Sequence, residues 1–191
     1  MKFSVISSTL PMALSVSIPR AIPTGSWLIS IESRYPLYLF DIIQANNGGF
    51  WYNKAPSSNC PDEVEGLDCS KYPGTQTAFI EGSVNGTVSL DVAVPGGQQV
   101  YVAPDGALSY TTPHSAALPE GAITTGFHRY RSETFGAPIM LSFAGKSIVA
   151  CPSPESKDVY QIYVGGTNGQ NCSWVNVYAE TSSSDAYEFT A

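Results

Sequence analysis

The chain has 191 residues and a formal net charge of −7 at pH 7, and only 13% of its residues are charged. This length suits one domain that buries most of its apolar surface. The acidic excess repels phosphate backbones and therefore excludes nucleic acid as a partner. Low charge combined with many Ser, Thr, Asn and Gly residues indicates a secreted protein with an uncharged polar surface.

The N-terminal residues have the pattern of a secretory leader. Residues 1–17 start with the short basic segment Met1-Lys2, continue with a mostly apolar run and end with small residues at the expected cleavage site. This leader is too short and too polar to span a membrane, and no later segment is suited to do so. We therefore predict a signal peptide at 1–17, an extended lead-in at 18–36, a single all-β domain at 37–191, and no membrane partner.

Beyond the leader, short apolar runs of strand length alternate with turn signals. Two long polar loops, 53–74 and 111–125, interrupt this pattern, and no stretch holds helical periodicity for three turns. The predicted strands cover residues 27–34, 38–45, 50–52, 75–84, 87–92, 100–102, 108–110, 127–131, 139–143, 147–150, 159–164, 174–179 and 187–189.

Three glycines divide the chain regularly: Gly49, Gly97 and Gly145 are separated by 97 − 49 = 48 and 145 − 97 = 48 residues. Each lies between two apolar runs. A fixed period of this size is typical of repeat architectures. We interpret it as a β-trefoil-like closed barrel of about twelve short strands in three repeats, which leaves no exposed sheet edge. The alternative is a two-sheet β-sandwich.

The four cysteines are an even number in an oxidising compartment, and three pairings are possible. Cys60 and Cys69 bracket a polar loop, whereas Cys151 and Cys172 bracket one apparent hairpin. We predict these two bridges. A zinc site is disfavoured because no Cys-x-x-Cys occurs and both histidines lie far from the cysteines in sequence.

No catalytic or phosphate-binding motif is present in the sequence. We therefore expect no enzymatic activity, no metal and no cofactor. One acidic cluster lacks the ligand spacing of a Ca²⁺ loop, and we interpret it as a solvated surface. Its members are Asp62, Glu63, Glu65 and Asp68.

Two groups of residues are candidates for binding. An aromatic run on one strand has the chemistry to stack on a sugar, although strand alternation sends at least one of its members into the core. A basic island on a later strand has the chemistry to bind a carboxylate or an anionic glycan, or to pair with the protein's own acidic loops. The candidate binding residues are Phe50, Trp51, Tyr52, His114, His128, Arg129 and Arg131.

Two sequons predict N-glycosylation. Asn85 precedes Gly-Thr in an apparent turn and is the better candidate, whereas Asn171 abuts Cys172.

Several segments resemble a known family. These are VPGGQQVYVAPDGALSY at 94–110, IVACP at 148–152, NNGGFW at 46–51 and the loop from Cys60 to Cys69. They resemble the secreted fungal IgE-binding-protein-like group and, more distantly, the fungal phialide cell-wall proteins, over about residues 37–178. The resemblance implies a fungal, extracellular, wall-associated protein without a known catalytic residue, and it supplies no site residues.

We therefore expect a secreted, non-enzymatic monomer at the fungal wall or the host–fungus interface. Its partner would be a host extracellular protein or a wall glycan, bound through loops on a β scaffold. One alternative is an effector that inhibits a host papain-like cysteine protease with the proline-containing loops 56–73 and 113–125. A second alternative is a lectin.

Overall fold

The computed structural model of the chain describes residues 21–33, 40–134, 136–166, 171–183 and 185–191. The expected signal peptide at 1–17 lies outside the described residues, as do both ends of the expected lead-in at 18–36.

The described residues form sixteen strands and one short 3-10 helix, η1. Most strands have three to six residues, because turn residues recur at short intervals along the sequence. The elements are β1 Trp27–Glu32, β2 Phe40–Ile42, β3 Gln44–Asn46, β4 Gly49–Tyr52, β5 Ser58–Asn59, η1 Cys69–Lys71, β6 Phe79–Glu81, β7 Val88–Leu90, β8 Gln98–Val102, β9 Leu108–Tyr110, β10 Phe127–Arg131, β11 Ile139–Phe143, β12 Ile148–Pro152, β13 Tyr160–Val164, β14 Ser173–Trp174, β15 Asn176–Thr181 and β16 Glu188–Phe189.

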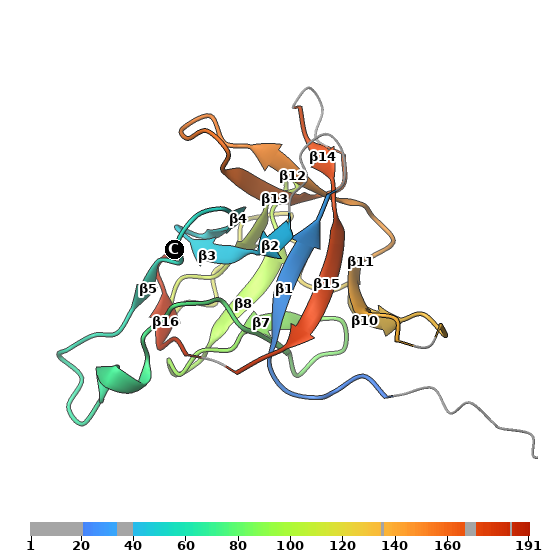
Figure 1. Ribbon diagram of the computed structural model, residues 1–191. Helices are drawn as coiled ribbons and strands as arrows, with labels where there is room; N and C mark the ends of the chain where they lie inside the picture. The colour runs from blue at the N-terminus through green and yellow to red at the C-terminus, as the bar shows by residue number, and fades with distance from the viewer. Residues whose placement is uncertain (1–20, 34–39, 135, 167–170, 184) are drawn as a thin grey trace, which may run out of the picture.

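One antiparallel sheet joins fourteen of these strands in the order β10-β11-β15-β1-β6-β7-β8-β9-β4-β13-β12-β14, with β2 on β1 and β3 on β4. It curls strongly, as a half-barrel, around the core (Figure 1). The remaining two strands, β5 and β16, pair with each other at the base of a projecting loop.

The inward faces of the strands meet in one hydrophobic cluster. Along β8, for example, buried and half-buried residues alternate, which is the period-two pattern of a sheet with one face on the core. At the centre, the ring of Phe79 lies 5.3 Å from the rings of both Trp27 and Phe50, and Phe50 lies 5.2 Å from Tyr110. These buried aromatic side chains supply much of the apolar area that holds the sheet in its curled shape.

The predicted all-β class is confirmed, but the three-repeat trefoil is not. Gly97 and Gly145 occupy turns with positive φ of 63° and 68°, whereas Gly49 is a strand residue at the start of β4. The strand that follows Gly145, β12, pairs with β13 and β14, whereas the one bridge across this turn joins Phe143 of β11 to Lys146, before β12 begins. Among the described strands, β10 and β14 stand at the two ends of the sheet path and do not pair with each other, so barrel closure is not confirmed either.

β1 confirms the strand predicted at 27–34, although it falls within the expected lead-in at 18–36. It is a central strand that pairs with β2, β6 and β15. The expected strand at 75–84 shortens to β6, because Thr77 forms side-chain contacts in place of a ladder. Its N–H donates to the side-chain oxygen Gln44 Oε1 at 2.9 Å, and its hydroxyl oxygen accepts from Ala45 N at 2.7 Å.

The structure pairs the cysteines as predicted. Cys60 and Cys69 are joined with their Cα atoms 5.8 Å apart, and Cys151 and Cys172 with theirs 4.1 Å apart. The second bridge ties the buried end of β12 to the segment just before β14. No helix in the described part of the chain is long and apolar enough to cross a bilayer.

Candidate binding surface

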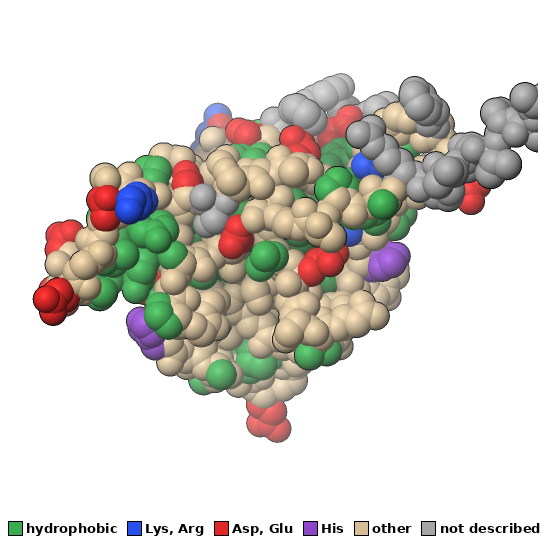
Figure 2. Space-filling model, turned by 90° about the horizontal axis from the view of Figure 1, so that it is seen from below, with side chains coloured by type: hydrophobic (Ala, Val, Ile, Leu, Met, Phe, Trp, Pro, Cys, Tyr) green, Lys and Arg blue, Asp and Glu red, His purple; other side chains and the backbone are tan. Residues whose placement is uncertain are grey.

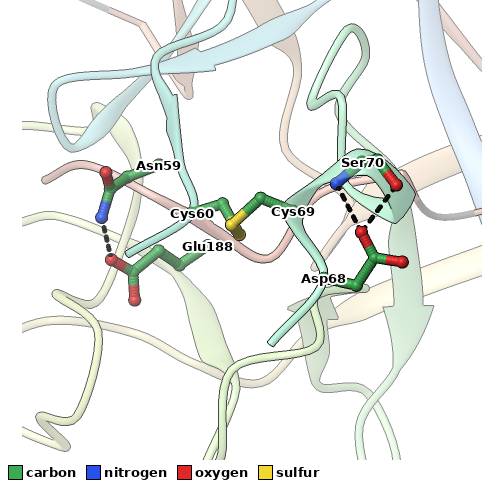
Figure 3. Close-up of a disulfide and its surroundings, with 6 residues drawn as sticks. All are labelled: Asn59, Cys60, Asp68, Cys69, Ser70 and Glu188. Atoms are coloured by element: carbon green, nitrogen blue, oxygen red, sulfur yellow. Dashed lines mark hydrogen bonds between the residues drawn. A yellow bond between two sulfur atoms is a disulfide. The ribbon is translucent and has the colours of Figure 1, made fainter. Parts of the chain in front are cut away.

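The first loop, residues 56–73, is anchored at its near end by a two-stranded ladder. Ser58 and Asn59 of β5 pair with Phe189 and Glu188 of β16. The side chains reinforce the ladder, because Asn59 Nδ2 donates to Glu188 Oε1 at 2.7 Å. The Cys60–Cys69 bridge follows directly and closes the projecting part of the loop (Figure 3).

The far end of the first loop returns to the same place. Gly74 is buried with φ of +59°, and a Cβ there would lie 2.0 Å from Ser58 Oγ. Only glycine allows this approach, which lets Ser58 Oγ donate to Gly74 O at 3.2 Å. Gly74 N in turn donates to Asp185 O at 2.7 Å. The two ends of the loop therefore hold each other and the C-terminal segment.

Within the loop, Asp68 caps the short helix η1. Its Oδ1 accepts from Ser70 N at 3.2 Å and from Ser70 Oγ at 2.6 Å (Figure 3). These hydrogen bonds, together with the nearby charge of Lys71, lower the pKa of Asp68 below 3.8. A side-chain cap of this kind satisfies backbone N–H groups that the first turn of a helix leaves without partners.

The second loop, residues 113–125, leads to the same strand β16. His114 has a positive φ of 59°, and its Nε2 lies 4.0 Å from Glu188 Oε2. The loop then returns through a bridge in which Ile123 and Val102 exchange backbone hydrogen bonds of 2.8 and 2.9 Å. Glu188 is only 9% exposed, and it contacts both long loops.

Two buried side chains hold β16 in position. Gln98 donates to Thr111 O and Phe189 O, each at 2.9 Å, and accepts from Phe189 N at 2.8 Å. Tyr110 donates its hydroxyl hydrogen to Thr190 O at 2.6 Å, and burial raises the pKa of Tyr110 to about 12. Both residues come from the curled sheet, so the loop base is fixed to the core.

The first loop ends in an exposed acidic tip. Asp62, Glu63 and Glu65 are exposed there, and Val64 between them is 44% exposed. The loop projects from the body in Figure 1, and acidic side chains stand at its outer end in Figure 2, with hydrophobic side chains behind them. Behind the tip, Tyr72 packs edge-on against Tyr187 with ring centroids 5.7 Å apart. Among the described residues, no group of three or more His, Cys, Asp and Glu is arranged to hold a metal ion.

The predicted aromatic run divides between the two faces of β4. Phe50 is fully buried, so it belongs to the core and is not accessible to a partner. Tyr52 is partly buried and packs against the core beside Tyr160, with ring centroids 6.1 Å apart. Trp51 points to the opposite face and is half-buried.

The predicted basic island divides in the same way. Arg129 is buried, and its Nε and Nη2 donate to Glu81 Oε1 at 3.1 and 2.8 Å. Its guanidinium lies 5.1 Å from the centroid of the Trp27 ring. Arg129 is thus engaged by the protein's own carboxylate. Arg131 is half-buried, whereas His128 is exposed and lies parallel to the Tyr130 ring, 6.2 Å away.

Both predicted sequons have exposed asparagines. Asn85 lies in the turn between β6 and β7, and Asn171 precedes Cys172.

Sequence reasoning missed Glu188, Gln98 and Asp185, the residues that assemble the loop base. Their partners lie 129, 91 and 110 residues away in sequence, respectively. A buried polar residue at an inward position of a strand, such as Gln98 in β8, is the one local signal that marks such a role.

One family model covers most of the chain. The family model described as PhiA-like secreted protein matches residues 28–188. A protein of Arthroderma benhamiae, named as an uncharacterized secreted protein, is 36% identical over 127 residues. That match covers 66% of this chain and 60% of the relative, so the chain spans less than two thirds of the relative's length. No solved structure matches. The resemblance to the IgE-binding-protein-like group is not confirmed, whereas the predicted secretion is confirmed. The chain belongs to the family of PhiA-like secreted proteins.

Proposed function

We propose that this secreted protein acts without catalysis, at the fungal wall or at the contact between fungus and host. It binds an extracellular protein through the first and second loops. The observation that carries the proposal is the position of Glu188, which lies 2.7 Å from Asn59 of β5 and 4.0 Å from His114 of the second loop. One buried carboxylate thus lies between the bases of two long loops.

A fixed base favours binding because it lowers the conformational entropy that the loops lose when they dock. Loops of this length in a compact fold are commonly functional. The acidic tip at Asp62, Glu63 and Glu65 selects a partner surface that carries Lys or Arg, because complementary charge steers encounter and rejects acidic partners.

The test compares two variants that remove the same charge from different places. Glu63→Gln with Glu65→Gln alters the tip, whereas Asp41→Asn with Glu133→Gln alters exposed acids elsewhere. Immobilised parent and variants are incubated with host extracellular fluid and with solubilised wall proteins, and the captured proteins are quantified. We expect the tip variant to lose partners that the control variant retains. Equal capture by all three proteins would contradict the loop proposal.

A second candidate function is inhibition of a papain-like cysteine protease. The observation that favours it is the projection of the first loop, closed by Cys60–Cys69 (Figure 1). Inhibition kinetics with papain test it directly, using the parent and the tip variant. A parent that leaves papain fully active removes this candidate and leaves the wall-protein proposal standing.

A further inference from the structure

A second surface, on the opposite side of β4 from the core, carries Trp51. The indole N–H donates to Asn46 O at 2.9 Å, and Lys54 Nζ lies 4.2 Å from the ring centroid. A side chain at Gly49 would place its Cβ 3.0 Å from Trp51 Nε1, so the bare glycine lets the indole lie against the strand. Three neighbours therefore fix the orientation of an aromatic side chain that is only half-buried.

The indole forms one wall of a cavity of about 280 Å³. Register explains how the cavity is assembled, because Gln161 of β13 lies opposite Trp51 of β4 and opposite Cys151 of β12. The Cys151–Cys172 bridge holds this part of β12 in place. The remaining polar and aromatic side chains that line the cavity are Ser153, Glu155 and Tyr163.

The polar groups of the cavity are partly oriented already. Tyr163 donates its hydroxyl hydrogen to Gln161 Oε1 at 3.0 Å. This bond turns the Gln161 amide so that Nε2, a donor with two hydrogens, lies over Gly49, 3.0 Å from where a Cβ would be. Glu155 adds carboxylate acceptors at the rim.

A fixed aromatic face beside an amide, a hydroxyl and a carboxylate matches the chemistry of a sugar ring. The apolar face of a pyranose packs on an indole, while its hydroxyl groups both donate to carboxylates and accept from amides. Glu155 is the charged side chain that lines the cavity, and its carboxylate repels anionic groups there, whereas Lys54 lies over the indole but outside the cavity lining. We infer that the cavity at Trp51 binds a neutral oligosaccharide. This site is separate from the loops and does not depend on the loop proposal.

The experiment measures binding by calorimetry to three soluble probes: a hexamer of β-1,3-linked glucose, a hexamer of N-acetylglucosamine and a hexamer of galacturonic acid. We expect the parent to bind a neutral hexamer and not the acidic one, and the two neutral probes distinguish a glucan from an amino-sugar polymer. Trp51→Ala should weaken binding about tenfold or more, because aromatic anchors dominate such interfaces. Gln161→Ala should also weaken it.

Trp174→Ala is the matched control, since Trp174 is 69% exposed and does not line this cavity. It should bind like the parent, as should the tip variant Glu63→Gln with Glu65→Gln. Thermal melts establish which variants fold. If Trp51→Ala does not fold, Gln161→Ala and Glu155→Gln decide the matter, because both change surface-accessible side chains. A folded parent that binds neither neutral hexamer, or cavity variants that bind like the parent, would overturn the inference.

Discussion

The curled sheet and the first loop are held together by different physics. In the sheet, Phe79 is fully buried between Trp27 and Phe50, and burial of apolar area supplies the stability. In the loop, Val64 is exposed at the tip, and order comes from a disulfide, a capping carboxylate and hydrogen bonds to the C-terminal segment. The loop therefore has little core of its own and depends on a few specific contacts, so the two regions should respond differently to substitution.

The largest expected effect is in the sheet. Phe79→Ala removes a fully buried ring whose centroid lies 5.3 Å from those of both Trp27 and Phe50. It should lower the free energy of unfolding by about 3–5 kcal/mol, measured by urea denaturation. Val64→Ala in the loop is the control and should change stability by less than about 0.5 kcal/mol. Similar effects at both positions would break the distinction between the two regions.

The two disulfides give the next comparison. Cys151 and Cys172 are 21 residues apart within the sheet, and Cys60 and Cys69 are 9 apart in the loop. Replacing Cys151 and Cys172 by Ser should lower the free energy of unfolding by about 3 kcal/mol. Replacing Cys60 and Cys69 by Ser should lower it somewhat less, because that bridge closes a shorter loop. Mass spectrometry of unreduced peptides should first show these two pairings. Four free thiols, or a different pairing, would contradict the structure.

The sequence predicts the sheet much better than the loop, for a physical reason. The strands β10 and β11 match the predicted 127–131 and 139–143, because alternation along a strand is a local consequence of one buried face. The pairing of β5 with β16 joins Asn59 to Glu188, and neither segment has a periodic pattern that would predict this pairing. The equal spacing of the three glycines misled the interpretation for the same reason. Spacing locates turns but does not determine which strands pair after them.

The same contrast applies to the candidate site. Strand alternation predicted that the aromatic run of β4 divides between two faces, and Phe50 and Trp51 do lie on opposite faces. The sequence did not reveal that Gln161 and Tyr163 lie beside Trp51, because β13 and β4 are far apart in sequence and become neighbours only in the folded sheet. Residues that carry an apolar pattern are predictable, whereas polar residues that meet across the sheet are not.

Tyr110 connects the two regions and gives a pH test of moderate size. Its ring packs on Phe50 in the core, and its hydroxyl donates to Thr190 O next to β16. Because burial raises its pKa from 10.0 to about 12, the neutral phenol is favoured in the folded state. This contribution is fully present below pH 10 and is lost as the pH rises through 12; by linkage it amounts to about 3 kcal/mol.

Urea denaturation of the parent between pH 9 and about 12 should therefore show a fall in stability that Tyr110→Phe reduces. Tyr110→Phe itself should cost about 1 kcal/mol at neutral pH, through loss of the bond to Thr190. The chain has 11 tyrosines, so the difference between parent and variant is the informative quantity. Equal alkaline slopes in the two proteins would show that Tyr110 is not the buried phenol described here.

The smallest expected effect lies in the loop, where Asp68 caps η1. Hydrogen bonds from Ser70 Oγ and Ser70 N lower the pKa of Asp68 below 3.8, so its carboxylate is favoured in the folded state. The cap therefore stabilises η1 above about pH 4 and is lost as the pH falls through the folded pKa. Titration of the Asp68 carboxyl by NMR should give a midpoint below 3.8 in the parent, and Ser70→Ala should raise that midpoint because both the hydroxyl donor and the preferred geometry are lost. Global stability should hardly change, since Asp68 is exposed. A midpoint that is the same in parent and Ser70→Ala would mean that the cap does not form in solution, and the loop would then be ordered by its disulfide and its base alone.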